Sequence, residues 1–510
     1  MPGNPSRVCA VVAEQTVGAA REAMRRAAKI ADLAELRLDY LRDFDFTNLD
    51  ALRALLEQKP LPTIITCRAA AEGGKQQVED RVRLRLLVEG ARRFADYCDI
   101  EAAHYAEAAA LTPDLSRLIV SYHNFVETPA DLNAIYERIT SLPAAVHKIV
   151  TRANEIADTI AIFKLLDRAR TDGRRLIALA MGEAGLITRV LGPAWGSFLT
   201  YGSLAQGKES AAGQPSCEDL ANLYRIRLVS RGTAITGIIG SPVGHSASPA
   251  MHNRAFAELA VDFVYLPFEV DELDEFFRRL ARPSTREIDW NLRGLSVTIP
   301  HKSAVIRLLD EVDEVARKVG AVNTVVMNED RLSGYNTDVR GAMEPLERAC
   351  SLAGESCAVI GAGGAARAVI YGLLERGSQV SVFARKPDKA RSLSESFGVT
   401  ILSIESLSSS DARVIINTTP VGMCGHSEGL SPVPRETLRG RSIAYDLVYN
   451  PLETRFLADA RAEGCRTISG LEMLVAQAAL QFELWTGRKP PIDEMREEAI
   501  ARIARHGQRL

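Results

Sequence analysis

The stretch SCAVIGAGGAARAVIYGLLERG, residues 356–377, predicts a β-strand, a glycine turn and an α-helix in direct succession. The apolar residues 357–360 precede Gly361, and the pattern Gly361-x-Gly363-x-x-Ala366 opens the helix. Glycines at this turn let the backbone approach a pyrophosphate, and the helix N-terminus offers N–H donors and a favourable dipole. The strand–turn–helix context therefore indicates a Rossmann-like domain that binds a dinucleotide.

The following strand, QVSVFAR at 379–385, decides which dinucleotide is expected. Sites for NAD usually place Asp or Glu at the end of this strand, where the carboxylate binds the ribose 2′-hydroxyl. Here the strand end carries Arg385 and Lys386 and no acidic residue. The two cations favour a 2′-phosphate and hence NADP(H), and a merely solvated basic turn is the alternative.

Apolar strands and amphipathic helices continue on both sides of this stretch. Downstream, RVIINTTP at 413–420 predicts a strand that ends in polar residues. Upstream, GSPVGHSASP at 240–249 predicts a strand that enters a Gly/Ser/Pro loop, followed by a helix over 250–260 and strands over 295–299 and 321–327. We expect two α/β subdomains from this part of the chain.

Residues 1–227 repeat the strand–helix alternation so regularly that a parallel (β/α)8 barrel is expected. Short apolar runs are the candidate strands, and amphipathic segments such as 24–31 separate them. The candidate strands are Val8–Ala13, Leu33–Leu38, Thr63–Arg68, Tyr97–Glu101, Leu118–His123, Val146–Val150, Leu176–Met181 and Phe198–Tyr201.

The bulk properties are those of a globular protein with more than one domain. The chain has 510 residues, 46% hydrophobic and 25% charged, with a formal net charge of -3. This charge argues against a nucleic-acid partner, which calls for a basic face. We find no apolar run long enough to cross a bilayer, no targeting pattern at the N-terminus and no C-x-x-C pair among the eight cysteines. We expect a cytoplasmic protein, and nothing in the pattern specifies its oligomeric state.

Polar residues fall at the ends of the predicted barrel strands, where parallel barrels build their active sites. Glu35 and Arg37 leave the same face of one strand, and Arg68 and His123 end two others. Lys148 lies among apolar neighbours in AAVHKIVT, where loss of hydration would favour a free amine able to attack a ketone. A lysine that pairs with a carboxylate at the barrel end would leave the same pattern.

Several motifs within residues 7–225 resemble type I 3-dehydroquinate dehydratases in order and spacing. They are ELRLD, TCRAAAEGG, SYHNF, HKIVTRAN, MGEAGLITR, TYGS and ESAAGQPS. The resemblance implies that Lys148 forms an imine with the substrate ketone, His123 transfers the proton and Glu72 orients His123. It further implies that Arg189 binds the substrate carboxylate, Met181 packs against the ring and no metal is needed. The residues that would hold ring hydroxyls are Glu35, Arg37, Arg68, Ser210 and Gln214.

A second set of motifs resembles shikimate dehydrogenases over about residues 234–500. Besides the glycine turn they are GSPVGHSASP, LSVTIPHK, GAVNT, GYNTD, NTTPVGM, YDLVYNP and GLEMLVAQA. The resemblance implies that Lys302 and Asp338 are the catalytic pair, although alone they would fit a surface lysine and a helix N-cap. The implied substrate-binding residues are Ser246, Ser248, Thr298, Asn323, Tyr449 and Gln477. The implied cofactor-binding residues are Gly361, Ala362, Gly363, Gly364, Ala365, Ala384, Arg385, Lys386, Asn417, Thr418, Met423 and Gly470.

Two departures from the dehydrogenase pattern concern specificity. Ser296 stands where many family members have Asn, and residues 384–386 read Ala-Arg-Lys where Asn-Arg-Thr is usual. Arg385 is kept, so NADP(H) stays favoured, while strict choice over NAD is in question. Ser296 and Glu472 resemble the fused plant-type enzymes, which share this order of the two halves.

The two resemblances imply a bifunctional enzyme that converts 3-dehydroquinate to 3-dehydroshikimate and reduces this product to shikimate with NADPH. We expect a barrel over 1–227, a substrate domain over 234–340 completed by 471–510, and a nucleotide domain over 341–470. The alternatives are a quinate-type metabolite-sensing regulator without turnover, an NAD-dependent quinate/shikimate dehydrogenase, and a chain with one active half. The presence of Lys148, His123, Lys302 and Asp338 argues against the first, and the missing acid after Phe383 argues against the second.

Overall fold

The computed structural model describes residues 6–205, 207–425 and 427–507. The outermost ends of the expected domains, 1–5 and 508–510, lie outside the described residues. None of the described helices is long and apolar enough to cross a membrane.

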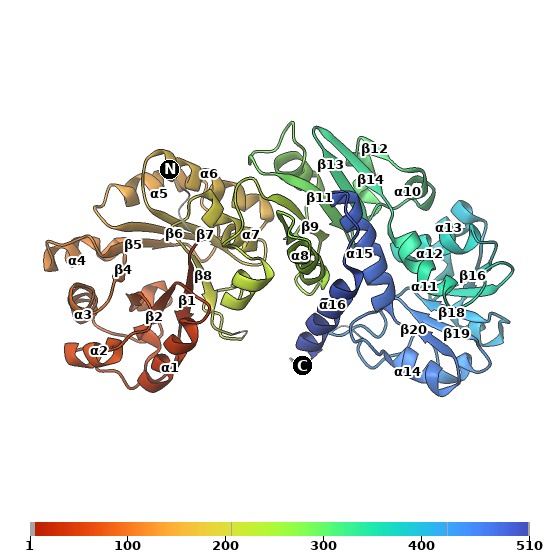
Figure 1. The fold of residues 1–510 in the computed structure, drawn as a ribbon, viewed down its shortest axis with the longest axis horizontal. Coiled ribbons are helices and arrows are strands. Elements are labelled where there is room, and N and C mark those ends of the chain that lie inside the picture. The colour runs from red at the N-terminus through yellow and green to blue at the C-terminus, as the bar shows by residue number, and fades with distance from the viewer. Residues whose placement is uncertain (1–5, 206, 426, 508–510) are drawn as a thin grey trace. The chain divides into compact units, whose positions relative to one another are not determined.

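The chain forms two compact units (Figure 1). The first unit contains the residues up to Thr233, together with Phe268–Ala281 and Thr285–Asn291. The second unit contains Ala234–Pro267, Arg282–Ser284 and the residues from Leu292 onward.

The first unit contains a barrel of eight parallel strands, which confirms the prediction from the sequence. The strands are β1 (Val8–Val12), β2 (Leu33–Arg37), β3 (Thr63–Thr66), β4 (Tyr97–Glu101), β5 (Leu118–His123), β6 (Val146–Arg152), β7 (Leu176–Met181) and β8 (Thr200–Ser203). They pair in the order β7-β6-β5-β4-β3-β2-β1-β8. The N–H of Phe198, just before β8, donates to the carbonyl of Leu176 in β7 at 2.8 Å and so brings the two ends of the sheet together.

Helices alternate with these strands and lie outside them in Figure 1. They are α1 (Val17–Ala27), α2 (Leu49–Leu56), α3 (Asp80–Arg93), α4 (Tyr105–Leu111), α5 (Leu132–Thr140), α6 (Thr159–Thr171) and α7 (Leu186–Leu191). Helix α1 shows why such a segment forms a helix here. The side chain of Thr16 caps the helix by accepting from the N–H of Ala19, and Ala20, Met24 and Ala27 form its buried face.

Alternation along each strand builds the barrel interior in layers. In β6, Val146, Lys148 and Val150 are two residues apart and therefore share one face. Val146 and Val150 belong to the apolar cluster that fills the barrel, and Lys148 lies between them. The interior thus combines an apolar packing layer with polar side chains at the level of Lys148.

The second unit begins with a mixed sheet of order β10-β9-β11-β13-β14-β12. Its strands are β9 (Ala234–Gly240), β10 (Phe263–Glu269), β11 (Leu292–Val297), β12 (Glu311–Val312), β13 (Thr324–Asn328) and β14 (Arg331–Tyr335). The helices of this part are α8 (Ser248–Glu258), α10 (Glu314–Val319), α15 (Gly470–Thr486) and α16 (Ile492–Gly507), whereas the short helix α9 (Leu273–Phe276) belongs to the first unit. Met251 and Phe256 of α8 pack with Phe482 of α15 and Met495 of α16, so the C-terminal helices join the core of this sheet.

The nucleotide part of the second unit is a parallel sheet of order β17-β16-β15-β18-β19-β20, as expected for a Rossmann-like domain. Its strands are β15 (Ser356–Ile360), β16 (Gln379–Ala384), β17 (Thr400–Ser403), β18 (Val414–Asn417), β19 (Ile443–Asp446) and β20 (Arg466–Ile468). Its helices are α11 (Asp338–Glu347), α12 (Gly364–Leu374), α13 (Arg391–Phe397) and α14 (Arg455–Ala462). Residues 356–377, which contain the glycine pattern, form β15, the turn and α12, as the sequence predicts.

The substitution Gly294→Ala is expected to destabilise the second unit by about 2 kcal/mol, because overpacking a buried site typically costs 1–3 kcal/mol. A Cβ at Gly294 would lie 2.0 Å from Nε1 of Trp485, whose N–H donates to the carbonyl of Val325 at 3.1 Å. Thermal unfolding checks the expectation. Gly18→Ala is the control, because a Cβ there has open space and α1 should lose no stability; equal unfolding temperatures for both variants would contradict the packing argument.

Candidate active sites in the two units

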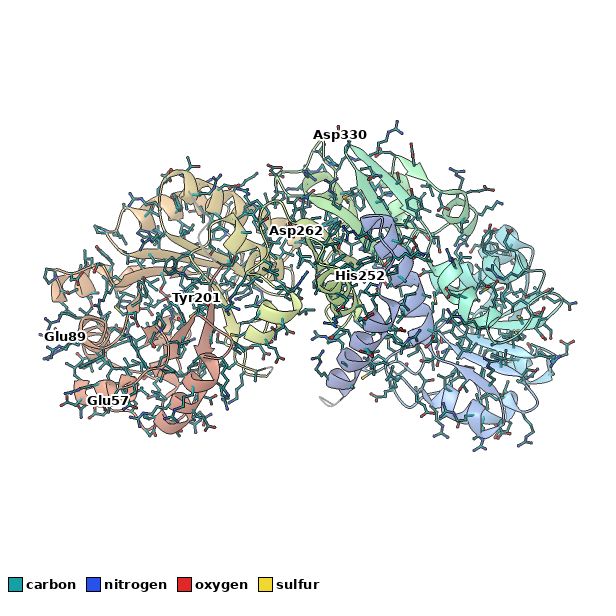
Figure 2. All side chains as sticks on the ribbon, in the orientation of Figure 1. Glu57, Glu89, Tyr201, His252, Asp262 and Asp330 are labelled. Atoms are coloured by element: carbon teal, nitrogen blue, oxygen red, sulfur yellow. The ribbon has the colours of Figure 1, made fainter. Side chains whose placement is uncertain are left out.

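Lys148 lies in the barrel interior, surrounded by two carboxylates and one aromatic ring. Its Nζ is 3.0 Å from Oδ2 of Asp99, 3.5 Å from Oε1 of Glu35 and 4.5 Å from the centre of the Tyr201 ring. Figure 2 labels Tyr201 within the barrel. The sequence left open whether Lys148 is buried or paired with a carboxylate. In the structure it is both buried and paired with carboxylates.

Asp99 is a residue of this site that the sequence analysis missed. Its Oδ1 accepts from Nη2 of Arg68 at 3.0 Å and from the hydroxyl of Ser121 at 2.7 Å. Burial raises the pKa of the Asp99 carboxyl, but Arg68 and Lys148 more than offset this effect and hold that pKa well below its usual range. The signal was present in YCDIE, because Asp99 and Glu101 are two apart in an otherwise apolar strand and share its inner face.

His123 ends β5 and is positioned as a neutral base. Its Nδ1 lies 3.3 Å from Oε2 of Glu72, and its ring stacks on Phe125. Burial, together with the positive charges of Arg68 and Lys148, lowers the pKa of His123 well below its ordinary value. Burial also raises the pKa of Glu72. A neutral imidazole in this place can accept a proton.

The remaining residues predicted for the barrel line one cavity of about 130 Å³. This lining includes Glu35, Arg37, Arg68, Glu72, His123, Lys148, Met181, Arg189, Ser210 and Gln214. Arg37 is paired through two bonds of 2.9 Å with Asp39, and the N–H and hydroxyl of Ser210 both donate to Oε1 of Gln214. The structure thus brings together every side chain that the dehydratase resemblance named.

Arg189 differs from the other arginines of this cavity. It is 2% exposed, and its Nε has no hydrogen-bond partner among the described residues. Burial lowers the pKa of its guanidinium to about 10. A buried cation that forms no ion pair with the described carboxylates, at the wall of a cavity, is suited to bind an anion such as a carboxylate.

In the second unit Lys302 and Asp338 form an ion pair, with 2.5 Å between Nζ and Oδ2. Asp338 is the first residue of α11, and its Oδ1 accepts from Nδ2 of Asn323 at 2.8 Å. The side chain of Lys302 is only 18% exposed. Lys302 is therefore no free surface lysine, and Asp338 follows the capping residue Thr337 rather than being the cap itself.

The predicted substrate residues of this unit line a cavity of about 190 Å³. They are Ser246, Ser248, Thr298, Lys302, Asn323, Asp338, Tyr449 and Gln477. Gln481 lines the same cavity and was missed. It lies one helical turn after Gln477, a spacing that places both side chains on one face of α15 and could have revealed it.

Ser296 connects this cavity to a buried network. The hydroxyl of Tyr265 donates to Ser296 at 2.7 Å, and the hydroxyl of Ser296 donates to Oε1 of Gln481 at 2.8 Å. Nε2 of Gln481 in turn donates to the carbonyl of Asn323 at 3.2 Å. The short side chain at position 296 therefore contacts a tyrosine and a glutamine within the protein.

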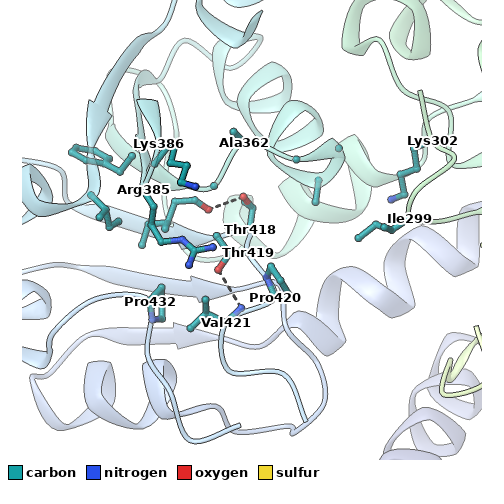
Figure 3. Close-up of a pocket in the computed structure, with 18 of the residues that line it drawn as sticks. Ile299, Lys302, Ala362, Arg385, Lys386, Thr418, Thr419, Pro420, Val421 and Pro432 are labelled. Carbon is teal, nitrogen blue, oxygen red and sulfur yellow. Dashed lines mark hydrogen bonds between the residues drawn. The ribbon is translucent and has the colours of Figure 1, made fainter. Parts of the chain in front are cut away.

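A larger cavity of about 730 Å³ lies along the glycine turn (Figure 3). Predicted residues in its lining are Gly361, Ala362, Gly363, Gly364, Ala365, Ala384, Arg385, Lys386 and Thr418. In Figure 3 Arg385 and Lys386 lie at one end of the cavity, and Lys302 and Ile299 lie at the other. Lys302 also lines the smaller cavity, so the two cavities meet at this side chain.

The residues of the larger cavity fit NADP(H). Gly361 has φ of +113°, and a Cβ there would lie 2.6 Å from Oγ1 of Thr418, so the turn requires glycine. Gly363 caps α12, whose N-terminal N–H groups can bind a pyrophosphate. Arg385 and Lys386 are exposed, and neither has a carboxylate partner within the described ranges. These cations are suited to a 2′-phosphate.

Three residues predicted for the cofactor side lie outside the lining of the larger cavity. Asn417 is buried: its Nδ2 donates to Asp446 at 2.9 Å, and its Oδ1 accepts from the N–H of Thr419 at 3.0 Å. Asn417 therefore holds the loop that lines the cavity. Gly470 lines the substrate cavity, and Met423 is 40% exposed away from both linings.

Family models match both halves of the chain. The model for type I 3-dehydroquinase matches residues 8–231, and the model for the shikimate dehydrogenase substrate binding domain matches 238–325. The model for the shikimate 5'-dehydrogenase C-terminal domain matches residues 470–500. The model for NADP oxidoreductase, coenzyme F420-dependent, matches residues 356–426 within the nucleotide part.

Similar proteins cover either the whole chain or its second half. The bifunctional 3-dehydroquinate dehydratase/shikimate dehydrogenase, chloroplastic, of Arabidopsis thaliana is 36% identical over 96% of this chain and 83% of its own length. The shikimate dehydrogenase (NADP(+)) of Pyrococcus abyssi is 43% identical over 53% of this chain and 99% of its own length. The solved dehydroquinate dehydratase and shikimate dehydrogenase from S. pombe AroM covers 98% of this chain with 25% identity and a TM-score of 0.44.

The fold and the two sites define a class of protein in which a lyase barrel is joined to an NADP-dependent dehydrogenase. Because a relative at 36% identity aligns with both halves, the chain belongs to the family of bifunctional 3-dehydroquinate dehydratase/shikimate dehydrogenases.

The imidazole of His123 is expected to stay neutral well below pH 6.5, the ordinary pKa of histidine, because burial and two cations oppose its protonation. The unfolded chain binds this proton at higher pH, so the group subtracts stability as pH falls below about 6.5. An NMR titration of histidine-labelled protein, with His123→Asn to assign the signal, measures the pKa. A value of about 6.5 or more would contradict the electrostatic account.

Proposed function

We propose that the chain catalyses two consecutive reactions, dehydration of 3-dehydroquinate to 3-dehydroshikimate and reduction of this product to shikimate with NADPH. The observation that carries the proposal is that one chain holds both catalytic sets, His123 and Lys148 in the barrel and Lys302 and Asp338 in the second unit. The activities are those in the names of the similar proteins. The product of the first reaction is the substrate of the second, so both sites serve one carbon skeleton.

In the barrel the neutral amine of Lys148 adds to the substrate ketone, and loss of water leaves a protonated imine. The imine withdraws electrons from the neighbouring carbon and makes its proton easier to remove. His123 takes this proton and returns one to the departing hydroxyl, and Glu72 orients the imidazole from 3.3 Å. Hydrolysis of the imine then releases the product and restores the amine.

The other residues of the barrel cavity hold the substrate in place. Arg189 binds its carboxylate, since this guanidinium is buried and its Nε has no partner in the described part of the chain. Met181 packs against the ring. The ring hydroxyls are bound by Glu35, Arg37, Arg68, Ser210 and Gln214.

In the second unit bound NADPH supplies the hydride. Lys302 donates a proton to the substrate oxygen as the carbonyl becomes a hydroxyl, and Asp338 holds the lysine and accepts from the adjacent hydroxyl. Ser246 and Ser248 bind the carboxylate. The ring hydroxyls are bound by Thr298, Asn323, Tyr449 and Gln477. Residues 361–365 hold the pyrophosphate, and Arg385 and Lys386 hold the 2′-phosphate.

This function assigns a task to each part of the chain. The dehydratase occupies residues 1–227, the substrate domain 234–340 with 471–510, and the nucleotide domain 341–470. We place the protein in the cytoplasm, and its eight free cysteines are compatible with a reducing compartment.

Neither alternative function is favoured by the sites. A metabolite sensor without turnover has no need for Lys148, which is buried beside carboxylates at a cost, or for the Lys302–Asp338 pair. An NAD-dependent quinate/shikimate dehydrogenase would need an acid at the end of β16, where Arg385 and Lys386 follow instead.

The variant Lys148→Ala is expected to lose dehydration by at least about a thousandfold, because the nucleophile is removed, and to keep the reductase activity. Lys302→Ala is expected to lose reduction and to keep dehydration. Enone absorbance with 3-dehydroquinate measures the first activity, and NADPH consumption with 3-dehydroshikimate measures the second. Retained dehydration in Lys148→Ala would remove the imine mechanism.

A matched control distinguishes catalytic loss from misfolding. Lys318 is an exposed lysine whose Nζ is 2.9 Å from Glu314, and Lys318→Ala should change neither activity. Loss of both activities in Lys148→Ala or Lys302→Ala would indicate a folding defect in place of the assigned role.

The variant Arg385→Asp is expected to raise the KM for NADPH by about tenfold to a hundredfold and to affect NADH far less, because one cation at the 2′-phosphate becomes an anion. Steady-state kinetics with both nucleotides check the expectation. Lys389→Asp, which makes the same charge change on an exposed residue outside the cavity lining, is the control. If the two substitutions had equal effects, the preference for NADPH over NADH would depend on the net charge of the protein and not on a contact made by Arg385.

A further inference from the structure

We propose that Asp99 and the face of the Tyr201 ring together stabilise the cationic nitrogen of Lys148 during dehydration, an inference that rests on imine formation at this lysine. Both groups contact the reacting atom: Oδ2 of Asp99 lies 3.0 Å from Nζ, and the centre of the Tyr201 ring lies 4.5 Å from it. The resemblance to the family assigned a role to neither residue. The two therefore extend the set of residues that act on the nitrogen.

The environment of Tyr201 favours an interaction through the ring face. Tyr201 lies in β8, is 4% exposed and lines the barrel cavity together with Lys148. Its hydroxyl has no hydrogen-bond partner in the part of the chain that the structure describes, so no hydrogen bond of the hydroxyl holds the ring in another position. The face of an aromatic ring attracts a cation within about 6 Å, and more strongly where water is excluded.

Asp99 supplies a negative charge in a fixed position. Its second oxygen accepts from Arg68 at 3.0 Å and from Ser121 at 2.7 Å, so the carboxylate cannot turn away from Lys148 without losing both bonds. The side chain is fully buried, where a charge of opposite sign acts with less screening than in water. Asp99 thus keeps a counter-charge at Nζ throughout the reaction.

The chemistry requires a site of this kind, because the positive charge is conserved. A lysine ammonium and a ketone yield a protonated imine and one water molecule, with no change in the number of hydrogens or in the charge. One proton leaves the ammonium before the nitrogen attacks, and it ends on the departing oxygen. The nitrogen of the protonated imine is therefore cationic when it serves as the electron sink.

The ring has more effect on the imine than on the resting lysine. An ammonium at this position has three N–H groups, and Nζ donates to Asp99 at 3.0 Å and to Glu35 at 3.5 Å. The protonated imine keeps one N–H group, and its charge spreads over a planar C=N unit that a ring face can cover. An interaction that grows stronger along the reaction is one that accelerates it.

The test reduces the negative electrostatic potential on the face of the ring at position 201 while the size of the ring stays nearly constant. Position 201 is replaced by phenylalanine and by phenylalanines with one, two and three ring fluorines, and the imine formed with 3-dehydroquinate is trapped with borohydride. The trapping rate, followed by the mass of the chain, is compared with that of Tyr201→Phe and is expected to fall stepwise by about tenfold over the fluorine series. A flat series would overturn the role of the ring.

Matched variants separate this outcome from other causes. The same fluorine series at Phe198, a buried ring of the barrel cluster that is not part of the lining of the cavity around Lys148, should leave the trapping rate unchanged. Asp99→Asn is expected to lower the rate by at least about tenfold, and a rate equal to that of the original protein would overturn the role of Asp99. Failure to trap any imine in the unsubstituted protein would contradict the proposed function itself, and Lys148→Ala provides the blank for this result.

Discussion

The burial of a lysine inside a parallel barrel is the constraint on which the first unit depends. Taking a charged group out of water is costly unless opposite charges and hydrogen bonds surround it, and removing one partner of a buried pair typically costs about 3–5 kcal/mol. The strands therefore carry a set of compensating charges, Glu35, Asp99, Glu101 and Lys148, which Arg68 just after β3 and Arg83 from α3 join. Arg189 stands outside this network, so the cavity offers an anionic substrate one cation whose Nε has no partner in the described protein.

In the second unit the largely buried lysine Lys302 is compensated by one carboxylate, that of Asp338. Lys302 and Asp338 neutralise each other, and Asn323 fixes the carboxylate through a bond of 2.8 Å. Behind them, the backbone carbonyl of Asn323 accepts from Gln481 of α15. Helix α15 therefore supports the Lys302–Asp338 pair through Asn323, although both residues precede this helix by more than a hundred positions. Lys302 lines both the smaller cavity and the cavity along the glycine turn, so this side chain lies where the two cavities meet.

Local patterns were sufficient to predict the strands of the barrel and the glycine turn, because each is set by hydrophobic periodicity and by backbone conformation within a short stretch. The site residues that could be predicted are those that lie within a recognisable sequence motif, such as Lys148 in HKIVTRAN. Asp99 was missed because its partners Lys148 and Arg68 are far away in sequence and only the closed barrel brings them together. Asn417 was assigned to the cofactor, whereas its amide is engaged by Asp446, a contact between neighbouring strands that periodicity does not reveal.

The most direct test of the account is to incubate the purified chain with 3-dehydroquinate and NADPH and to follow enone absorbance and NADPH together. The account predicts a transient enone followed by loss of NADPH, since one chain holds both sites. No enone, with NADPH consumed only when 3-dehydroshikimate is added, would contradict the role of Lys148. Enone that accumulates while NADPH stays constant would contradict the roles of Lys302 and Asp338.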